Sequence, residues 1–268
     1  MKVAIIGGGN MGSTYAKAFV RSNIVKADDL AIIEKHEEKR AELKHEIPAH
    51  IYQDFGDFLS EYSIIIIAVK PQDFRTMALE MKKYLHEGQM IISIMAGIRI
   101  ENIQSLLDQK NVVRAMPNTP AQLGFGITAF TASPATPFES ISIVDTLLET
   151  TGKAIFMKDE EQLDAVTALS GSGPAYFYYF VKSMIEAGRQ MGIEEPVAAM
   201  LVKQTMLGSF QIMNNSQLTL DQMIKMVASK GGTTEAALNA FESNDVGLNI
   251  INALKAAETR AKELSANM

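Results

Sequence analysis

Four short apolar runs constrain the fold of this chain more than any other feature of its sequence. The runs occupy residues 3–6, 30–33, 64–67 and 90–94. None of them alternates apolar with polar residues, and such continuous runs are typical of strands that are covered on both faces in a parallel sheet. Amphipathic stretches separate the runs and a further strand-like run follows, at residues 11–21, 37–44, 74–84 and 111–116. This order of strands and helices predicts an α/β fold around a parallel sheet.

After residue 158 the strand-like runs stop and long helical patterns take their place. These patterns cover residues 163–169, 175–191, 197–214 and 246–264. A chain of 268 residues is long enough for two ordinary domains. We therefore predict one domain at residues 1–158 and an all-helical domain at residues 159–268. Its Met-, Ala- and Leu-rich helices favour burial against a second copy of the chain, although the core of a monomer would also account for them.

The composition of the chain excludes some classes of binding partner. The net charge of -6 provides no basic surface for a phosphate backbone, so we expect no binding to nucleic acid. No segment approaches the ~20 apolar residues of a membrane span, and the first apolar run is too short for a signal peptide, so we expect no membrane association. The sequence contains no cysteine. This excludes disulfides and thiolate chemistry and favours the cytoplasm.

A glycine-rich segment directly follows the first apolar run and opens the first helical stretch. Gly7, Gly9 and Gly12 match the pattern G-x-G-x-x-G. In this pattern the first glycine makes a tight turn, the second lets the backbone approach a pyrophosphate, and the third allows a helix to pack closely on a strand. The diphosphate then lies at the positive end of the helix. The segment predicts a Rossmann-type, dinucleotide-binding domain at residues 1–158.

The residues after the second run favour different dinucleotides. Glu34 lies where a carboxylate holds the ribose hydroxyls of NAD. Lys35, Lys39 and Arg40 follow it, and cations at this place favour the 2′-phosphate of NADP. A solvated helix face would explain the same charges. We favour NADP, because Lys35 follows the strand end, and keep NAD as the alternative.

The histidines argue against a metal site and against an alcohol substrate. All four, His36, His45, His50 and His86, lie in the first part of the chain, and no two have metal-ligand spacing. Oxidation of an alcohol normally needs a positioned base, and the second half holds no histidine for that role. A protonated cyclic imine accepts a hydride directly at carbon. One hydroxyl or carboxylate near its nitrogen would then suffice.

Two turns of small residues each precede a helical pattern in the second half, at residues 170–175 and 229–235. Free backbone amides and hydroxyls at the start of a helix hold a substrate carboxylate well. Ordinary helix capping by Ser and Thr is the alternative for either turn. Two such turns in one domain favour an anion site.

Together these motifs resemble those of the pyrroline-5-carboxylate reductase family, over nearly the whole chain. The segments that carry the resemblance are residues 7–12, 68–71, 96–97, 116–120, 169–175 and 231–234. The resemblance implies an NAD(P)H-dependent enzyme that reduces 1-pyrroline-5-carboxylate to L-proline. It implies one Rossmann domain and one helical dimerisation domain. The expected assembly is a homodimer, which in the family often forms decamers.

The resemblance also implies roles for individual residues. To the three glycines, Glu34 and Lys35 it adds, as cofactor-binding positions, Asn10, Met11, Val69, Lys70, Pro71, Ala96, Gly97 and Asn118. Ala96 and Gly97 would lie near the nicotinamide. The positions that would bind the substrate are Ser229, Gly232, Thr233 and Glu160. Thr234 is the implied catalytic position, where its hydroxyl would bond the ring nitrogen.

Two positions depart from the family pattern. Lys230 stands where the family usually has proline, and Met226 stands where a polar residue is common. Proline would fix the backbone of the turn, whereas lysine adds a charge or loosens the loop. Two alternatives therefore remain open. One is a paralogue that reduces another cyclic imine or a small hydroxy acid, and the other is a protein that senses dinucleotide without turnover.

Overall fold

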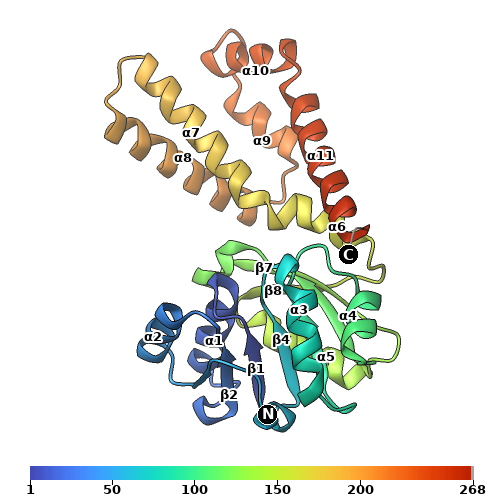
Figure 1. Cartoon of the computed structure of the whole chain (residues 1–268). Coiled ribbons are helices and arrows are strands. Elements are labelled where there is room, and N and C mark those ends of the chain that lie inside the picture. Colours follow the sequence, from blue (N-terminus) through green and yellow to red (C-terminus); the bar gives the residue numbers. More distant parts are fainter. Residues whose placement is uncertain (267–268) are drawn as a thin grey trace. The chain divides into compact units, whose positions relative to one another are not determined.

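The computed structural model describes residues 1–266, and its first part is built on one eight-stranded sheet (Figure 1). The strands are β1 Val3–Ile6, β2 Leu30–Ile33, β3 His50–Tyr52, β4 Ile64–Ile67, β5 Met90–Ser93, β6 Val112–Met116, β7 Gly126–Ala132 and β8 Gly152–Phe156. Their order across the sheet is β3-β2-β1-β4-β5-β6-β7-β8. Only β6 and β7 pair antiparallel in this sheet. From β1 the chain runs to one edge of the sheet through β2 and β3, and then continues at β4 on the other side of β1. Rossmann-type folds bind their ligands at this point, where the strand order reverses.

Helices cover both faces of this sheet. They are α1 Asn10–Arg21, α2 Glu37–Glu46, α3 Pro71–Met81, α4 Ile100–Leu107, α5 Phe138–Glu149 and α6 Gln162–Val166. Short 3-10 turns span Ala27–Asp29, Asp57–Glu61, Lys82–Tyr84 and Thr119–Leu123, and a π-helical turn spans Thr167–Gly171. The predicted parallel α/β fold of the Rossmann type is confirmed.

The four apolar runs lack alternation because successive side chains enter two different cores. Ile5 and Ile66 pack with Phe19 of α1 in one core, whereas Ile65 packs with Phe74 of α3 in the other. Side chains alternate between the two faces of a strand, and here both faces are buried. The parallel arrangement therefore needs an apolar residue at every position of the central strands.

The remaining helices are α7 Gly173–Gln190, α8 Glu195–Asn215, α9 Leu220–Val227, α10 Thr233–Ser243 and α11 Val246–Ala266. The chain divides into two compact units: a sheet unit, Met1–Gly173 together with residues 257–266, and a helical unit, Pro174–Ala256. The end of α11 thus belongs to the sheet unit. The functional boundary expected after residue 158 stays a prediction. Within residues 1–266, no helix has both the length and the apolar character for crossing a membrane.

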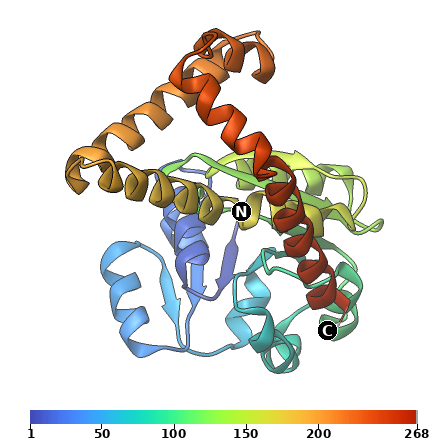
Figure 2. The ribbon, with the colours of Figure 1, turned by 90° about the horizontal axis from the view of Figure 1, so that it is seen from above.

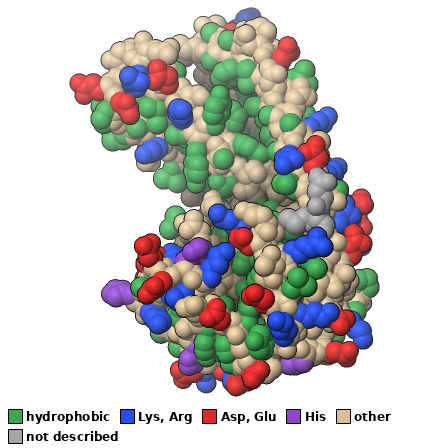
Figure 3. Space-filling model, viewed as in Figure 1, with side chains coloured by type: hydrophobic (Ala, Val, Ile, Leu, Met, Phe, Trp, Pro, Cys, Tyr) green, Lys and Arg blue, Asp and Glu red, His purple; other side chains and the backbone are tan. Residues whose placement is uncertain are grey.

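The helical unit buries few of its own apolar side chains. Ala198 of α8 is buried, and a Cβ added to Gly188 of α7 would lie 2.9 Å from the Ala198 Cβ, so these helices touch near their connecting turn. Figure 2 shows α7 and α8 diverging from that turn. Large apolar side chains remain exposed along them, among them Phe177, Tyr178, Met200, Leu207 and Phe210. The green side chains over these helices in Figure 3 show the same surface.

Candidate active site

The glycine-rich loop between β1 and α1 has a separate structural reason for each glycine of its pattern. Gly7 has a φ of 102°, and a Cβ there would lie 2.9 Å from the Ala68 carbonyl oxygen. A Cβ on Gly12 would strike the Gly7 carbonyl, because α1 packs directly on the loop. A Cβ on Gly9 would meet no atom of residues 1–266 within 4 Å. The loop is therefore closed by Gly7 and Gly12 and open at Gly9, where a pyrophosphate would approach the backbone.

The start of α1 provides free hydrogen-bond donors at this opening. Gly9 is the residue that caps the helix, and the first turn contains no acidic residue. The amides of Gly9, Asn10, Met11 and Gly12 precede the first bonds of the helix and have no partner within it. Both the amides and the helix dipole favour an anion at this end. These residues fit the diphosphate of a dinucleotide.

Glu34 holds this loop to the segment that follows β2. Its carboxylate is buried and accepts the Gly8 N–H at 2.9 Å through Oε2 and the His36 N–H at 2.9 Å through Oε1. Arg40 donates to the carbonyl oxygens of Glu34 and Lys35 at 3.1 and 2.6 Å. Glu34 thus braces two backbone segments at once. Lys35 is exposed, and its ammonium makes no ion pair within residues 1–266.

A cleft of about 700 Å³ follows the carboxyl ends of β1, β2 and β4. Of the positions expected to bind the cofactor, it contains Gly7, Gly9, Glu34, Lys35, Val69 and Lys70. The cleft therefore joins the glycine loop to the segments after β2 and β4. Asn10, Met11 and Gly12 lie beside the loop at the start of α1, and the other expected cofactor positions belong to neighbouring segments.

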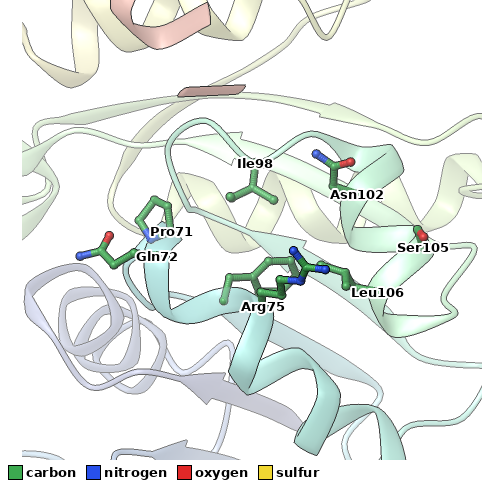
Figure 4. Close-up of a pocket in the computed structure, with 8 residues that line it drawn as sticks. Pro71, Gln72, Arg75, Ile98, Asn102, Ser105 and Leu106 are labelled. Carbon is green, nitrogen blue, oxygen red and sulfur yellow. The ribbon is translucent and has the colours of Figure 1, made fainter. Parts of the chain in front are cut away.

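Pro71, Ala96 and Gly97 belong to the next segments along the sheet edge. Pro71 is the first residue of α3, and Ala96 and Gly97 lie in the loop between β5 and α4. Pro71 and Ile98 line one further hollow of about 340 Å³, between α3 and α4. In Figure 4 the Ile98 side chain lies between Pro71 and Asn102. The loop after β5 is therefore a neighbour of the segment after β4, which lines the larger cleft.

Asn118 connects the segment at residues 116–120 to the segment at residues 169–175. Its side-chain amide nitrogen donates to Ser170 Oγ at 3.2 Å, and its Oδ1 accepts the Ile127 N–H at 3.1 Å. A Cβ added to Gly171 would strike the Met116 Cε. The segments at 116–120 and 169–175 thus touch at two places. The predicted contact of Asn118 with a cofactor stays a prediction, since both ends of its amide already bond the protein.

The helical unit carries the second turn, which precedes α10. Gly231 has a φ of 74° and allows the reversal, while the Gly232 N–H donates to the Ser229 carbonyl at 3.0 Å. Gly232 caps the helix, so α10 begins at Thr233, inside the segment at residues 229–235 that was expected to precede a helix. Thr234 is half-buried. Within residues 1–266, no hydrogen bond uses the Thr234 hydroxyl, and none of the capping bonds of this helix comes from a side-chain hydroxyl.

Comparison with known proteins covers both units. Residues 160–264 match the family described as pyrroline-5-carboxylate reductase dimerisation, and residues 2–97 match NADP oxidoreductase coenzyme F420-dependent. A pyrroline-5-carboxylate reductase of Staphylococcus haemolyticus is 34% identical over 100% of this chain and 99% of its own length. The chain belongs to the pyrroline-5-carboxylate reductase family. The family predicted from the motifs is confirmed.

Other members of the pyrroline-5-carboxylate reductase family agree in extent and in fold. The Pseudomonas aeruginosa reductase is 33% identical over 98% of this chain and 97% of its own length. A crystal structure of the Plasmodium falciparum pyrroline carboxylate reductase with NADP bound has a TM-score of 0.89 and 27% identity, and covers 99% of this chain and 98% of its own. The Rossmann sheet and the helical second domain are therefore those of a reductase of this family.

Glu160 lies apart in the chain from the other positions expected to bind the reductase's substrate. It belongs to the sheet unit, whereas Ser229, Gly232, Thr233 and Thr234 belong to the helical unit. Its Oε1 accepts the Ile100 N–H at 2.8 Å and a bond from Arg114 at 3.2 Å. These bonds give Glu160 a structural role. Its contact with the substrate stays a prediction.

Several residues that line the cleft of this reductase were not predicted from the sequence. They are Gln53, Asp54 and Phe55 after β3, and Lys83 and Tyr84 after α3. β3 has three residues and none of them is buried, so it lacks the continuous apolar signal of the central strands. The order of the strands supplies the missing information, because β3 lies beside β2. The residues that follow both strands therefore share one edge of the sheet.

Proposed function

We propose that this chain reduces 1-pyrroline-5-carboxylate to L-proline, with NADPH as the hydride donor. The similarity to reductases of this name along the full length of the chain carries the proposal. The structure supports it with one site suited to a dinucleotide, at Gly9, and one turn suited to a carboxylate, before Thr233. Both are what a reductase of an anionic cyclic imine requires.

The residues of the cleft suit NADPH. The coenzyme, when bound, supplies the hydride for the imine carbon. The amides of Gly9, Asn10 and Met11 would bind its diphosphate at the start of α1. Lys35 is exposed at the cleft, where a cation favours the 2′-phosphate. Glu34 already accepts two backbone N–H bonds, so its carboxylate is engaged in holding the loop.

The turn before α10 would hold and orient the substrate. The first amides of α10 lack partners within the helix, and they suit the carboxylate of the pyrroline. The Ser229 hydroxyl and the exposed Thr233 lie at the same helix start. The Thr234 hydroxyl would bond the ring nitrogen and present the imine carbon to the hydride. Positioning of this kind lowers the barrier without a separate base.

Turnover by the purified chain tests the proposal. With 1-pyrroline-5-carboxylate in excess, the absorbance of NADPH should fall and L-proline should accumulate. Binding of NADPH without consumption of it by any cyclic imine or hydroxy acid would favour the dinucleotide sensor. Turnover of another imine but not of the pyrroline would favour the paralogue, in which Lys230 and Met226 would have changed the choice of substrate.

The variants Thr234→Ala and Thr234→Ser test the catalytic position. Because Thr234 makes no capping bond, its loss should leave the melting temperature nearly unchanged. Thr234→Ala should lose at least about tenfold in kcat/KM, equivalent to ~1.4 kcal/mol at the transition state. Thr234→Ser keeps the hydroxyl and should retain most activity. Steady-state kinetics and thermal melts measure both, and normal turnover by the alanine variant would remove Thr234 from the mechanism.

We also propose a homodimer formed through the helical unit, with assembly into decamers, in the cytoplasm. The match of residues 160–264 to a dimerisation family supports the dimer. The exposed apolar side chains of α7 and α8 support it as well, because a contiguous apolar surface marks an interaction site. The absence of cysteine from the sequence supports a reducing compartment.

A further inference from the structure

Arg114 of β6 is the centre of a buried polar network. The residue is 2% exposed. Its Nη1 donates to Glu160 Oε1 at 3.2 Å, and its Nη2 donates to Asp164 Oδ1 at 2.7 Å. A guanidinium removed from water is tolerated only when such partners replace the lost hydration. The dinucleotide and substrate roles proposed above leave the pairing of Arg114 with Asp164 unused.

Each carboxylate of the network also holds a second group. Glu160 Oε1 accepts the backbone N–H of Ile100, the first residue of α4, at 2.8 Å. Asp164, 1% exposed, accepts the hydroxyl of Ser265, 2% exposed, at 2.9 Å. Ser265 lies in the last turn of α11. Arg114 therefore links the start of α4 to the end of α11 through two carboxylates.

Both attachments flank the loop at residues 94–99, which joins β5 to α4. Ile100 directly follows this loop. Gly97 within it has a φ of 73°, and a Cβ there would lie 3.2 Å from the Leu264 Cβ and 3.5 Å from the Ser265 nitrogen. The last turn of α11 thus lies against the face of the loop that carries Gly97, and Glu160 holds the loop's far end.

The topology places this loop beside the dinucleotide cleft. It follows β5, and the Ile94 N–H donates to the Ile67 carbonyl at the end of β4 at 3.0 Å. The next residues after β4 include Val69 and Lys70, which line the cleft. Ile98 and Pro71 share a hollow in Figure 4. A dinucleotide whose adenosine lies after β2 and whose diphosphate lies on the loop after β1 extends over the ends of β4 and β5.

We propose that Arg114, Asp164 and Ser265 are positioning residues for the coenzyme, because they fix the loop at residues 94–99 in the form that receives its nicotinamide half. This inference rests on the proposed function for the identity of the coenzyme. A loop held in its bound form before binding loses less conformational entropy when the ligand arrives. The end of α11 thereby contributes to coenzyme affinity without touching the coenzyme.

The variant Ser265→Ala tests the inference in the full-length chain. It removes one hydroxyl and leaves the Arg114–Asp164 ion pair in place, so the fold should persist. The dissociation constant for NADPH should rise about fivefold, because the loosened loop must then be ordered when the coenzyme binds. The amides of Gly97, Ile98 and Ile100 should exchange faster with solvent hydrogen, while those of Ile66 in the sheet core should not. The KM for 1-pyrroline-5-carboxylate should stay within about twofold.

The variant Arg260→Ala is the matched control. Arg260 lies on the same helix, where it makes an exposed ion pair with Glu263 at 2.7 Å, and its loss should leave NADPH affinity and loop exchange unchanged. Unchanged NADPH affinity in Ser265→Ala, even with a lower melting temperature, would make the network purely structural and overturn the inference. NADPH binding by the unmodified chain without turnover would contradict the proposed function and leave this inference standing. The dissociation constant for NADPH and the hydrogen exchange of the amides are both measured without substrate.

Discussion

The sheet unit and the helical unit handle apolar side chains in opposite ways. Side chains of β1, β4 and β5 fill two cores that are closed by helices. Those of α7 and α8 lie largely on the surface of the single chain. A unit closed on both faces is stabilised by its own packing, whereas an exposed apolar face is stabilised when a partner covers it. The contrast assigns stability to the sheet unit and assembly to the helical unit.

The largest effect is expected when two carboxylates are placed on the apolar face of α8. Leu207 and Phe210 are 54% and 50% exposed, and they lie three residues apart, on one side of the helix. The double variant Leu207→Asp, Phe210→Asp should abolish self-association, because burial of unpaired charge costs several kcal/mol. Sedimentation velocity should show a monomer.

Asn239→Asp is the control, since it adds a charge at an exposed polar position of the same unit. It should sediment like the unmodified chain. An oligomer that survives both aspartates would mean that this face of α8 is open to solvent in the assembly.

Ile66→Ala tests whether the sheet unit is stabilised by its own packing. Ile66 is 1% exposed and packs in the core between β4 and α1. The cavity should lower the free energy of unfolding by about 2–5 kcal/mol. Denaturant titrations at several protein concentrations should give the same loss each time. A loss that vanishes at high concentration would indicate that the sheet unit, too, depends on a partner.

Lys35→Ala separates ligand binding from stability in the sheet unit. Lys35 is exposed beside the cleft, so the melting temperature should hold. The KM for NADPH should rise about tenfold, or ~1.4 kcal/mol, with a much smaller rise for NADH. Kinetics with both coenzymes provide the comparison. Equal rises in the two KM values would mean that Lys35 acts only as a general surface charge and that Glu34 determines the choice of coenzyme.

The smallest effect is expected from Tyr15→Phe. The Tyr15 hydroxyl is buried and lies 3.0 Å from Thr128 Oγ1, which connects α1 to β7. Burial raises the pKa of this phenol above its ordinary value, so the group stays neutral at physiological pH. The variant should lose about 1 kcal/mol of unfolding free energy. Thermal melts at pH 6 and pH 8 should give equal losses, and a pH-dependent loss would contradict the neutral state.

The sequence predicted best those elements whose signals are local and continuous. The strands at residues 3–6, 30–33 and 64–67 were predicted to the residue, because both of their faces are buried. β8 was missed, since its residues are half-buried or exposed. β7 was missed although it is largely buried, because it contains Gly126 and Thr residues within its apolar stretch.

The candidate site also combines local features, which the sequence predicts, with long-range contacts, which it does not. The loop at Gly7, Gly9 and Gly12 is contiguous, and its glycine pattern predicts the backbone geometry directly. The network of Arg114 gave no signal, because its partner Asp164 lies 50 residues away and Ser265 lies a further 101 residues along. Contacts of that kind depend on the order of the strands and on the path of α11. Neither follows from local pattern.

The placement of the last turn of α11 has a consequence for the synthesis of the chain. The sheet unit is interrupted in sequence by the helical unit and is completed by residues 257–266. During translation, Ser265 leaves the ribosome after the whole helical unit. Its hydrogen bond to Asp164 can form only then. Until then the loop at Gly97 lacks the turn that lies against it. The nascent Rossmann sheet can therefore form early, whereas the loop at residues 94–99 reaches its final form only after the helical unit has been synthesised.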